Sequence, residues 1–208
     1  MEPERLWLDD TAWVDVTRGY LADADAVYDE VLANSQWQQG RLWRYEKWID
    51  EPRLSAWGTP ANAHPALLQT QRDVEKQYGV RFPGGFGLAY YRTGADGQAF
   101  HRDNDMKWCE NTIIAILTLG ATRPWLLRPK SNRYAHHLDR HGATHDLRPA
   151  SGDLLVMGGT CQVGWEHSVE KLRTPVAGRI SVQWRWTSRT GRPERTAGYG
   201  APLRFSRR

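Results

Sequence analysis

Residues 152–167 read GDLLVMGGTCQVGWEH. The apolar run at 154–157 is typical of a buried strand, and the two glycines that follow it indicate a tight turn. His167 comes shortly after this turn. The stretch therefore predicts a buried strand with a candidate functional histidine close behind it.

Four further segments after Gly79 are also short and rich in β-branched and aromatic residues. They are GFGLAYYR at 85–92, TIIAILTL at 112–119, PWLLRP at 124–129 and RISVQWRWT at 179–187. Two helical patterns precede them, one at 23–34 and one that begins at Pro65 and ends at Gly79, a residue suited to a left-handed helix end. Helices first and strands afterwards predict an α+β domain with a β-sandwich or jelly-roll core and the helices packed outside the sheet.

The length of 208 residues and a hydrophobic fraction of 40% fit one globular domain spanning 1–208. No apolar run is long enough to cross a bilayer, and the acidic start MEPERLWLDD lacks the pattern of a secretory signal. The two cysteines are too few for a disulfide framework. We expect a soluble, cytoplasmic monomer without membrane association.

Positive charge is concentrated at the carboxyl end of the chain. The net charge is +4, but residues 171–208 contain ten Lys or Arg and one acid, Glu194, an excess of +9 that leaves −5 elsewhere. Such an end suits a polyanion such as nucleic acid, and it equally suits a solvated tail that keeps the protein soluble. Residues 191–208 have little apolar content and are expected to form a basic, partly disordered tail.

His101 and Asp103 form a candidate metal-binding pair. Alternate side chains of an extended segment point to the same side, so both can reach one ion, and His167 is the best candidate for a third ligand. Two imidazoles and one carboxylate on one face of an octahedral ion leave three positions open, as in non-haem Fe(II) oxygenases. An H-x-D pair alone is weak evidence, because it is common in polar turns.

The segment RISVQWR at 179–185 alternates cleanly between polar and apolar residues. Arg179 and Ser181 share one face with the polar residues at 183 and 185, while the apolar residues share the other face. An arginine facing inward over a sheet is costly unless a carboxylate meets its planar fork, so Arg179 predicts a dicarboxylate ligand. The alternative is the solvated face of an edge strand.

Four segments occur in a characteristic order: PRLSAWG at 52–58, YYRTG with HRD at 90–103, GDLLVMGGTCQVGWEH at 152–167 and RISVQWR at 179–185. In this order they resemble the AlkB family of nucleic-acid dealkylating oxygenases, and the third segment is too long and specific for a chance match. The resemblance covers about residues 52–186. It implies a double-stranded β-helix fold and an oxidative demethylase that uses Fe(II), 2-oxoglutarate and dioxygen.

The resemblance also implies roles for individual residues. The expected iron ligands, which are also the expected catalytic residues, are His101, Asp103 and His167. The expected cosubstrate-binding residues are Tyr91, Arg179, Ser181 and Arg185. Among these, Arg179 would bind the distal carboxylate of 2-oxoglutarate, and Arg185 would stabilise the metal end of the site.

The chain departs from the family pattern at three places. Ala89 and Ser181 stand where the family commonly has asparagine, so one cosubstrate contact is lost and another is made by a shorter side chain. The family's Trp-Tyr-Gly after the PRL motif is reduced to Trp57-Gly58, which implies a different mode of substrate recognition.

Residues 39–58 lie where the family carries its substrate lid. Cationic and aromatic side chains alternate here, a mixture that suits phosphates together with an extruded base. The candidate substrate-binding residues are Trp43, Tyr45, Arg53 and Trp57. The alternative is an amphipathic edge hairpin whose tryptophans pack inward.

A second group of histidines lies in the polar segment 131–150, which is expected to be a long loop between strands. The group comprises His136, His137, His141 and His145, with Asp139 nearby. Their spacing matches neither a zinc finger nor an HExxH motif, so we interpret them as part of a solvated loop. His64, the remaining histidine, is expected at the surface.

The resemblance thus predicts an enzyme that removes N-alkyl groups from bases in DNA or RNA, a repair reaction that releases formaldehyde, succinate and carbon dioxide. The expected partner is a single-stranded nucleic acid or an alkylated nucleotide. Three alternatives stay open. They are an oxygenase of the same fold that acts on a small molecule or a protein side chain, a non-catalytic nucleic-acid-binding module, and, more weakly, a zinc hydrolase.

Overall fold

A computed structural model gives the fold, and it describes residues 2–44, 46–103, 106, 109, 111–130 and 144–188. The strands are β1 (Glu4–Trp7), β2 (Ala12–Thr17), β3 (Gln38–Arg44), β4 (Lys47–Gly58), β5 (Phe86–Tyr91), β6 (Gln98–His101), β7 (Thr112–Gly120), β8 (Trp125–Pro129), β9 (His145–Asp146), β10 (Leu154–Gly159), β11 (Trp165–Val169) and β12 (Arg179–Thr187). The helices are α1 (Ala24–Asn34), α2 (Pro65–Tyr78) and α3 (Cys161–Gly164). The helices and strands expected from the sequence are therefore present.

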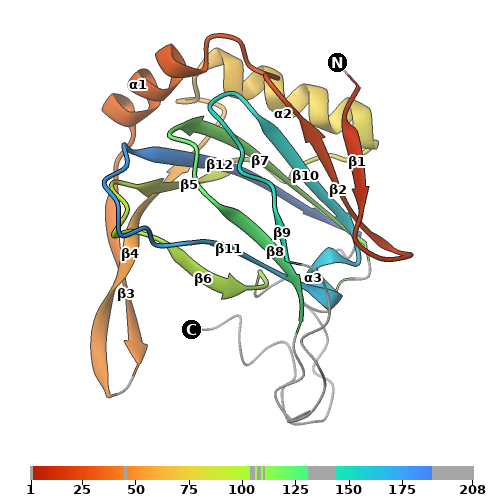
Figure 1. Cartoon of the computed structure of the whole chain (residues 1–208). Coiled ribbons are helices and arrows are strands. Elements are labelled where there is room, and N and C mark those ends of the chain that lie inside the picture. The colour runs from red at the N-terminus through yellow and green to blue at the C-terminus, as the bar shows by residue number, and fades with distance from the viewer. Residues whose placement is uncertain are drawn as a thin grey trace, which may run out of the picture.

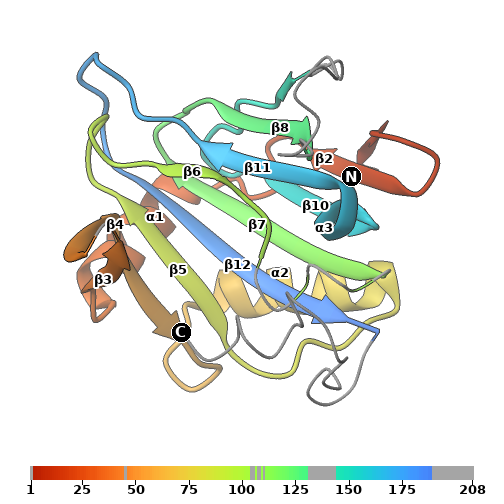
Figure 2. The same cartoon turned by 90° about the horizontal axis from the view of Figure 1, so that it is seen from below.

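Two antiparallel sheets face each other. The larger sheet has the order β1-β2-β10-β7-β12-β5-β4-β3, and the smaller has the order β6-β11-β8-β9. Helices α1 and α2 cover the outer face of the larger sheet (Figure 1), and the smaller sheet lies across its inner face (Figure 2). This arrangement is the predicted jelly roll with its helices outside the sheet.

The central strands β7 and β10 are apolar on both faces because each face packs against a different layer. In β7, Ala115 and Leu117 belong to the core under the helices, whereas Ile114 and Ile116 belong to the core between the sheets. A strand buried on both sides needs no alternation of polar and apolar residues. This explains the uninterrupted apolar runs in the sequence.

Strand β12 also lies inside the larger sheet, next to β7, but its inner face carries polar residues. Its apolar residues Ile180, Val182 and Trp184 pack under the helices, so Arg179 and Ser181 point between the two sheets, where both are buried. β12 pairs with β5 on one side and with β7 on the other. The alternative that this segment is a solvated edge strand is therefore wrong.

The two long helices begin and end close to the predicted positions. Gly79 has a φ of 64° and ends α2 in the left-handed conformation, as its place in the sequence indicates. His64, which the sequence predicts only as a surface residue, has a structural role. Its Nδ1 accepts a hydrogen bond from the backbone N–H of Ala66 at 3.1 Å. It therefore caps the start of α2.

Several predicted features fall wholly or partly outside the described residues. They are Tyr45, the first part of the 131–150 loop with His136, His137 and His141, and the 191–208 tail. The last part of the loop contains a short strand, β9, that pairs with β8. Neither long helix of the described chain combines the length and apolarity needed to cross a lipid bilayer.

The β3–β4 hairpin lies at one edge of the larger sheet and projects from the molecule (Figure 1). Three of its tryptophans, Trp43, Trp48 and Trp57, are 59%, 57% and 64% exposed. The alternative in which the hairpin tryptophans pack inward is therefore wrong for these three. Their exposed rings are available to a binding partner.

A glycine in β10 tests the packing of the larger sheet. A β-carbon at Gly158 would overlap the Trp13 ring, which is itself stacked on Tyr78 at 5.7 Å between ring centroids. We expect Gly158→Ala to lower the free energy of unfolding by about 1–3 kcal/mol, measured by urea denaturation. Gly164→Ala is the control, since its β-carbon would meet nothing within 4 Å. Equal stability of the two variants would contradict this packing.

Candidate active site

Two neighbouring strands of the smaller sheet bring the predicted metal ligands together. His101 at the end of β6 lies directly opposite His167 in β11, with 4.2 Å between the ring centroids. Asp103 follows β6 by two residues. One nitrogen or oxygen atom from each of these residues lies within 4.8 Å of the other two. The three side chains can therefore hold one metal ion.

The two histidines are neutral near pH 7, so each has a ring nitrogen with a free lone pair. Burial lowers the pKa of His167 to about 3, and burial also lowers the pKa of His101. The Nδ1 of His101 lies 2.9 Å from the carbonyl oxygen of Ala99, which can only accept a hydrogen bond. Nδ1 therefore carries the proton, and Nε2 is left free to bind a metal.

Asp103 is ionised and held by Arg185 of β12. Burial opposes the charge of Asp103, but the charge and hydrogen bond of Arg185, together with the interactions with His167 and His101, hold the pKa of this carboxyl far below its usual range. Arg185 Nε donates to Oδ2 at 2.6 Å, while Oδ1 lies 3.7 Å from the Nε2 of His101. Two neutral nitrogens and one carboxylate oxygen form the donor set expected for Fe(II).

Arg179 is a buried cation with an incomplete set of partners. The side chain is 0% exposed, and its Nη2 donates to the hydroxyl of Thr118 at 3.2 Å. Its Nε and Nη1 are buried and have no hydrogen-bond partner in the part of the chain that the structure describes. Burial lowers the pKa of Arg179 to about 10, so the group stays charged at neutral pH. These unpaired nitrogens fit a carboxylate group.

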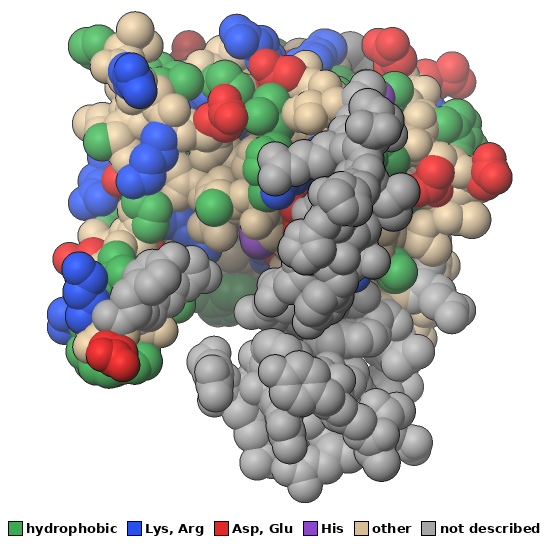
Figure 3. Space-filling model, turned by 60° about the horizontal axis from the view of Figure 1, so that its bottom comes forward, with side chains coloured by type: hydrophobic (Ala, Val, Ile, Leu, Met, Phe, Trp, Pro, Cys, Tyr) green, Lys and Arg blue, Asp and Glu red, His purple; other side chains and the backbone are tan. Residues whose placement is uncertain are grey.

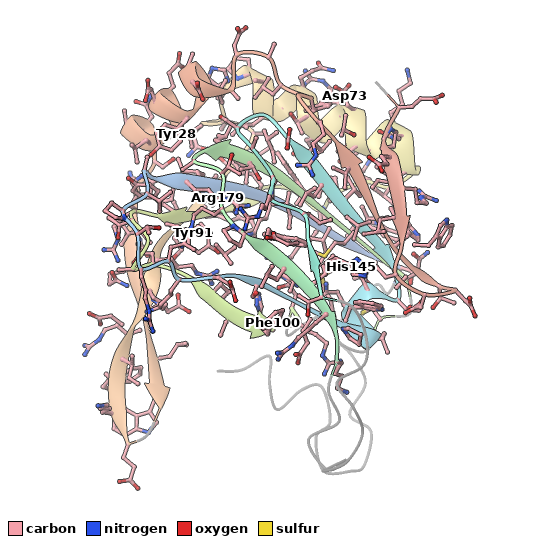
Figure 4. The ribbon with its side chains drawn as sticks, in the orientation of Figure 1. Tyr28, Asp73, Tyr91, Phe100, His145 and Arg179 are labelled. Carbon is pink, nitrogen blue, oxygen red and sulfur yellow. The ribbon has the colours of Figure 1, made fainter. Side chains whose placement is uncertain are left out.

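Further hydroxyl groups lie beside Arg179. Tyr91 of β5 is its cross-strand neighbour, and Figure 4 shows both side chains in the interior between the sheets. The hydroxyls of Ser181 and Ser168 are buried without partners among the described residues. Ser181 shares the inner face of β12 with Arg179, and with Tyr91 they form a polar region that fits the oxygens of 2-oxoglutarate, while Ser168 lines the cavity from β11.

Sequence reasoning missed three residues of this region. Thr118 is a hydroxyl residue within the otherwise apolar β7, and this interruption is the signal that could have found it. Ser168 lies in the mixed segment WEHSV, which offers no such signal. The indole of Trp125 stacks on His167 at 5.6 Å between centroids and 22° between planes. Trp125 carries no such signal, because an aromatic residue is ordinary in a strand.

A cavity of about 730 Å³ lies between these groups and the hairpin. The three ligand residues line it from the smaller sheet, and Tyr91, Ser181 and Arg185 line it from the larger sheet. Arg179 itself lies behind this lining. The volume falls in the usual range for ligand pockets and leaves room for part of a second molecule beside a small dicarboxylate.

The hairpin provides the outer wall of the cavity, through Arg53 and Trp57. Burial is the main cause of the lowered pKa values of both histidines, and the positive charge of the nearby Arg53 lowers these pKa values further. Trp43 is outside the lining and instead packs edge-on against Trp48, with 5.5 Å between centroids. Figure 3 views this side of the molecule, where histidine surface is visible in the hollow beside the hairpin.

Comparison with known proteins places this site in a family. The model of the 2OG-Fe(II) oxygenase superfamily matches residues 32–192. The alpha-ketoglutarate-dependent dioxygenase alkB homolog 3 of Bos taurus is 28% identical over 182 residues, which are 79% of this chain and 62% of that protein. The DNA oxidative demethylase ALKBH2 of Homo sapiens is 27% identical over 182 residues, which are 79% of this chain and 69% of that protein. The chain thus spans less than two thirds of the length of the Bos taurus relative.

Solved structures agree with the fold. A Pseudomonas putida prolyl-4-hydroxylase has a TM-score of 0.54 and 18% identity, covering 86% of this chain and 93% of that one. OsALKBH1 has a TM-score of 0.57 and 13% identity, covering 87% of this chain and 100% of that one. At such identities the likeness concerns the fold alone. From the match over residues 32–192 and the donor set between its sheets, the chain belongs to the 2OG-Fe(II) oxygenase superfamily, with AlkB-type proteins among its relatives, as its motifs predict.

Proposed function

We propose that the protein is an Fe(II)- and 2-oxoglutarate-dependent dioxygenase that removes N-alkyl groups from bases in DNA or RNA. One observation carries this proposal: the three-ligand site and the unpaired cation of Arg179 lie in the same interior between the sheets. A protein that only binds nucleic acid needs neither, and burying an unpaired guanidinium costs stability. A zinc hydrolase has no use for a dicarboxylate-binding group.

The chain's own residues hold and orient the reactants. His101, Asp103 and His167 would hold iron from one side and leave other positions open. Arg179 would fix the distal carboxylate of 2-oxoglutarate, so that the 2-oxo acid end points toward the metal, and Tyr91 would restrict its rotation. When bound, iron would activate dioxygen as the oxidant of both substrates, so that the N-alkyl carbon leaves as formaldehyde and 2-oxoglutarate is converted to succinate and carbon dioxide.

The substrate part of the proposal is supported by the outer wall of the cavity. Arg53 and Trp57 place a cation and an exposed aromatic face at its mouth, which suits a phosphate and an unstacked base. The relative ALKBH2 is a DNA oxidative demethylase by name, which points to the same substrate class. Oxidation of a small molecule or protein side chain is the alternative, and the cytoplasmic location and monomeric state stay predictions.

We expect His101→Ala, Asp103→Ala and His167→Ala each to lose nearly all iron-dependent succinate formation. Each change removes one of three metal ligands, and the open site should let the fold survive. Tight binding of Mn(II), measured by calorimetry, should be lost as well. His145→Ala is the matched control, since this histidine lies outside the ligand group. Substantial activity in all three ligand variants would remove this site from the proposal.

We expect Arg179→Ala to raise the Kd for 2-oxoglutarate at least tenfold, because an unpaired buried carboxylate costs about 2–5 kcal/mol. Mn(II) binding should stay close to that of the wild type. Without 2-oxoglutarate the variant should melt no lower than the wild type, because two nitrogens of this buried cation have no partner to lose. An unchanged Kd for 2-oxoglutarate would contradict the assigned role.

We expect an N-methylated oligonucleotide to be demethylated faster when single-stranded than when annealed, because extruding a paired base costs a few kcal/mol. Binding should also weaken with salt, as counterions are released by Lys and Arg contacts. Arg53→Ala and Trp57→Ala should raise the apparent KM for the oligonucleotide. Formaldehyde release at two salt concentrations measures both effects.

Two adjacent glycines provide a matched control for Trp57. A β-carbon at Gly85 would lie 2.6 Å from the Nε1 of Trp57, whereas one at Gly84 would meet nothing within 4 Å. Both glycines have positive φ, so both alanine variants carry similar backbone strain. Gly85→Ala should therefore raise the KM like Trp57→Ala, and Gly84→Ala should not. Salt-insensitive binding with no effect of these variants would favour the small-molecule alternative.

A further inference from the structure

The short helix α3 links the two segments that carry the metal ligands. It follows β10 and leads directly into β11, which contains His167. It also contacts the ligand segment after β6, because the guanidinium of Arg102 donates to the carbonyl oxygens of Gln162 at 3.3 Å and Val163 at 3.0 Å. The position of α3 therefore affects both segments.

The side chain of Gln162 makes the closest connection to a ligand. Its Oε1 accepts a hydrogen bond from the backbone N–H of Asp103 at 2.8 Å. Gln162 is 1% exposed, and its Nε2 is buried without a hydrogen-bond partner among the described residues. An amide buried with one end unsatisfied is unfavourable for stability alone, so the Asp103 bond is the interaction that accounts for this residue.

Two bonds together restrict Asp103. Gln162 holds its backbone N–H, and Arg185 holds its carboxylate Oδ2 at 2.6 Å. With both ends held, Oδ1 remains directed toward His101, whose Nε2 lies 3.7 Å away. The carboxylate therefore keeps its place even though Asp103 lies beyond the end of β6.

We propose that Gln162 is a positioning residue of the metal site: it touches neither metal nor substrate, but fixes the peptide of Asp103 so that the carboxylate meets both histidines. Partners that orient metal ligands contribute about 10- to 100-fold to metal affinity. This inference rests on the metal-binding part of the proposed function and is independent of the substrate.

The test is Mn(II) affinity, measured by calorimetry on the whole chain without 2-oxoglutarate. Gln162→Met keeps the length of the side chain and removes the acceptor, and it should weaken Mn(II) binding about 10- to 100-fold. Gln162→Glu keeps an oxygen at the same distance and replaces the amide with a carboxyl, whose negative charge attracts the cation, so Mn(II) affinity should not fall below that of the wild type. The electron paramagnetic resonance spectrum of bound Mn(II) should change in the Met variant alone.

A neighbouring residue separates positioning from general damage to α3. Cys161 is also buried, and its thiol donates to the carbonyl oxygen of Trp13 at 3.2 Å. Cys161→Ser should bind Mn(II) like the wild type. The proposal is overturned if folded Gln162→Met binds Mn(II) as tightly as wild type, or if Cys161→Ser or Gln162→Glu loses as much affinity. If the wild-type protein binds Mn(II) normally but demethylates no substrate, the proposed reaction is contradicted. The comparison of variants still decides the role of Gln162 in that case.

Discussion

The burial of Arg179 without an anion is the constraint on which the interior between the two sheets depends. A guanidinium in apolar surroundings costs free energy unless acceptors meet its nitrogens. The nearby buried Arg123 meets most of this requirement, because its two Nη atoms donate to carbonyl oxygens of Thr93, Asp96 and Glu170, and its Nε alone lacks a partner among the described residues. Arg179 has one hydroxyl partner and two unpaired nitrogens. The fold thus supplies three acceptors to Arg123 and one to Arg179, which leaves most of the Arg179 guanidinium for a ligand.

The layered fold is what makes such a burial possible. Ile180, Val182 and Trp184 of strand β12 pack under the helices. Pairing with β5 on one side and β7 on the other fixes which face of β12 points toward the helices. Shifting the register by one residue would expose this apolar face to the inner side and place Arg179 under the helices. The free energy gained by the helix-side core therefore holds the polar face in place between the sheets.

Much of this could be predicted from the sequence, because alternation along one strand is local information. The inner face of β12 and the two helix ends follow from spacing alone. The roles of Ser168 and Gln162 could not be assigned in this way, because they depend on contacts between distant segments, such as the bond between Gln162 and Asp103. The ligand triad needed both kinds of information, and the family motif supplied the pairing that spacing lacks.

The β3–β4 hairpin beside the cavity also depends on contacts that local sequence patterns do not show. Strand β4 pairs with β5 over Leu54–Gly58, while its first residues pair only with β3. Trp57 therefore lies on the body of the sheet at the cavity, whereas Trp43 lies in the part held mainly by contacts within the hairpin. An isolated two-stranded ribbon is only marginally stable, so this part of the hairpin can change shape at lower cost than the sheet. The proposed cosubstrate region is thus built into the interior between the sheets, and the proposed substrate region begins on the sheet and extends onto the hairpin at its edge.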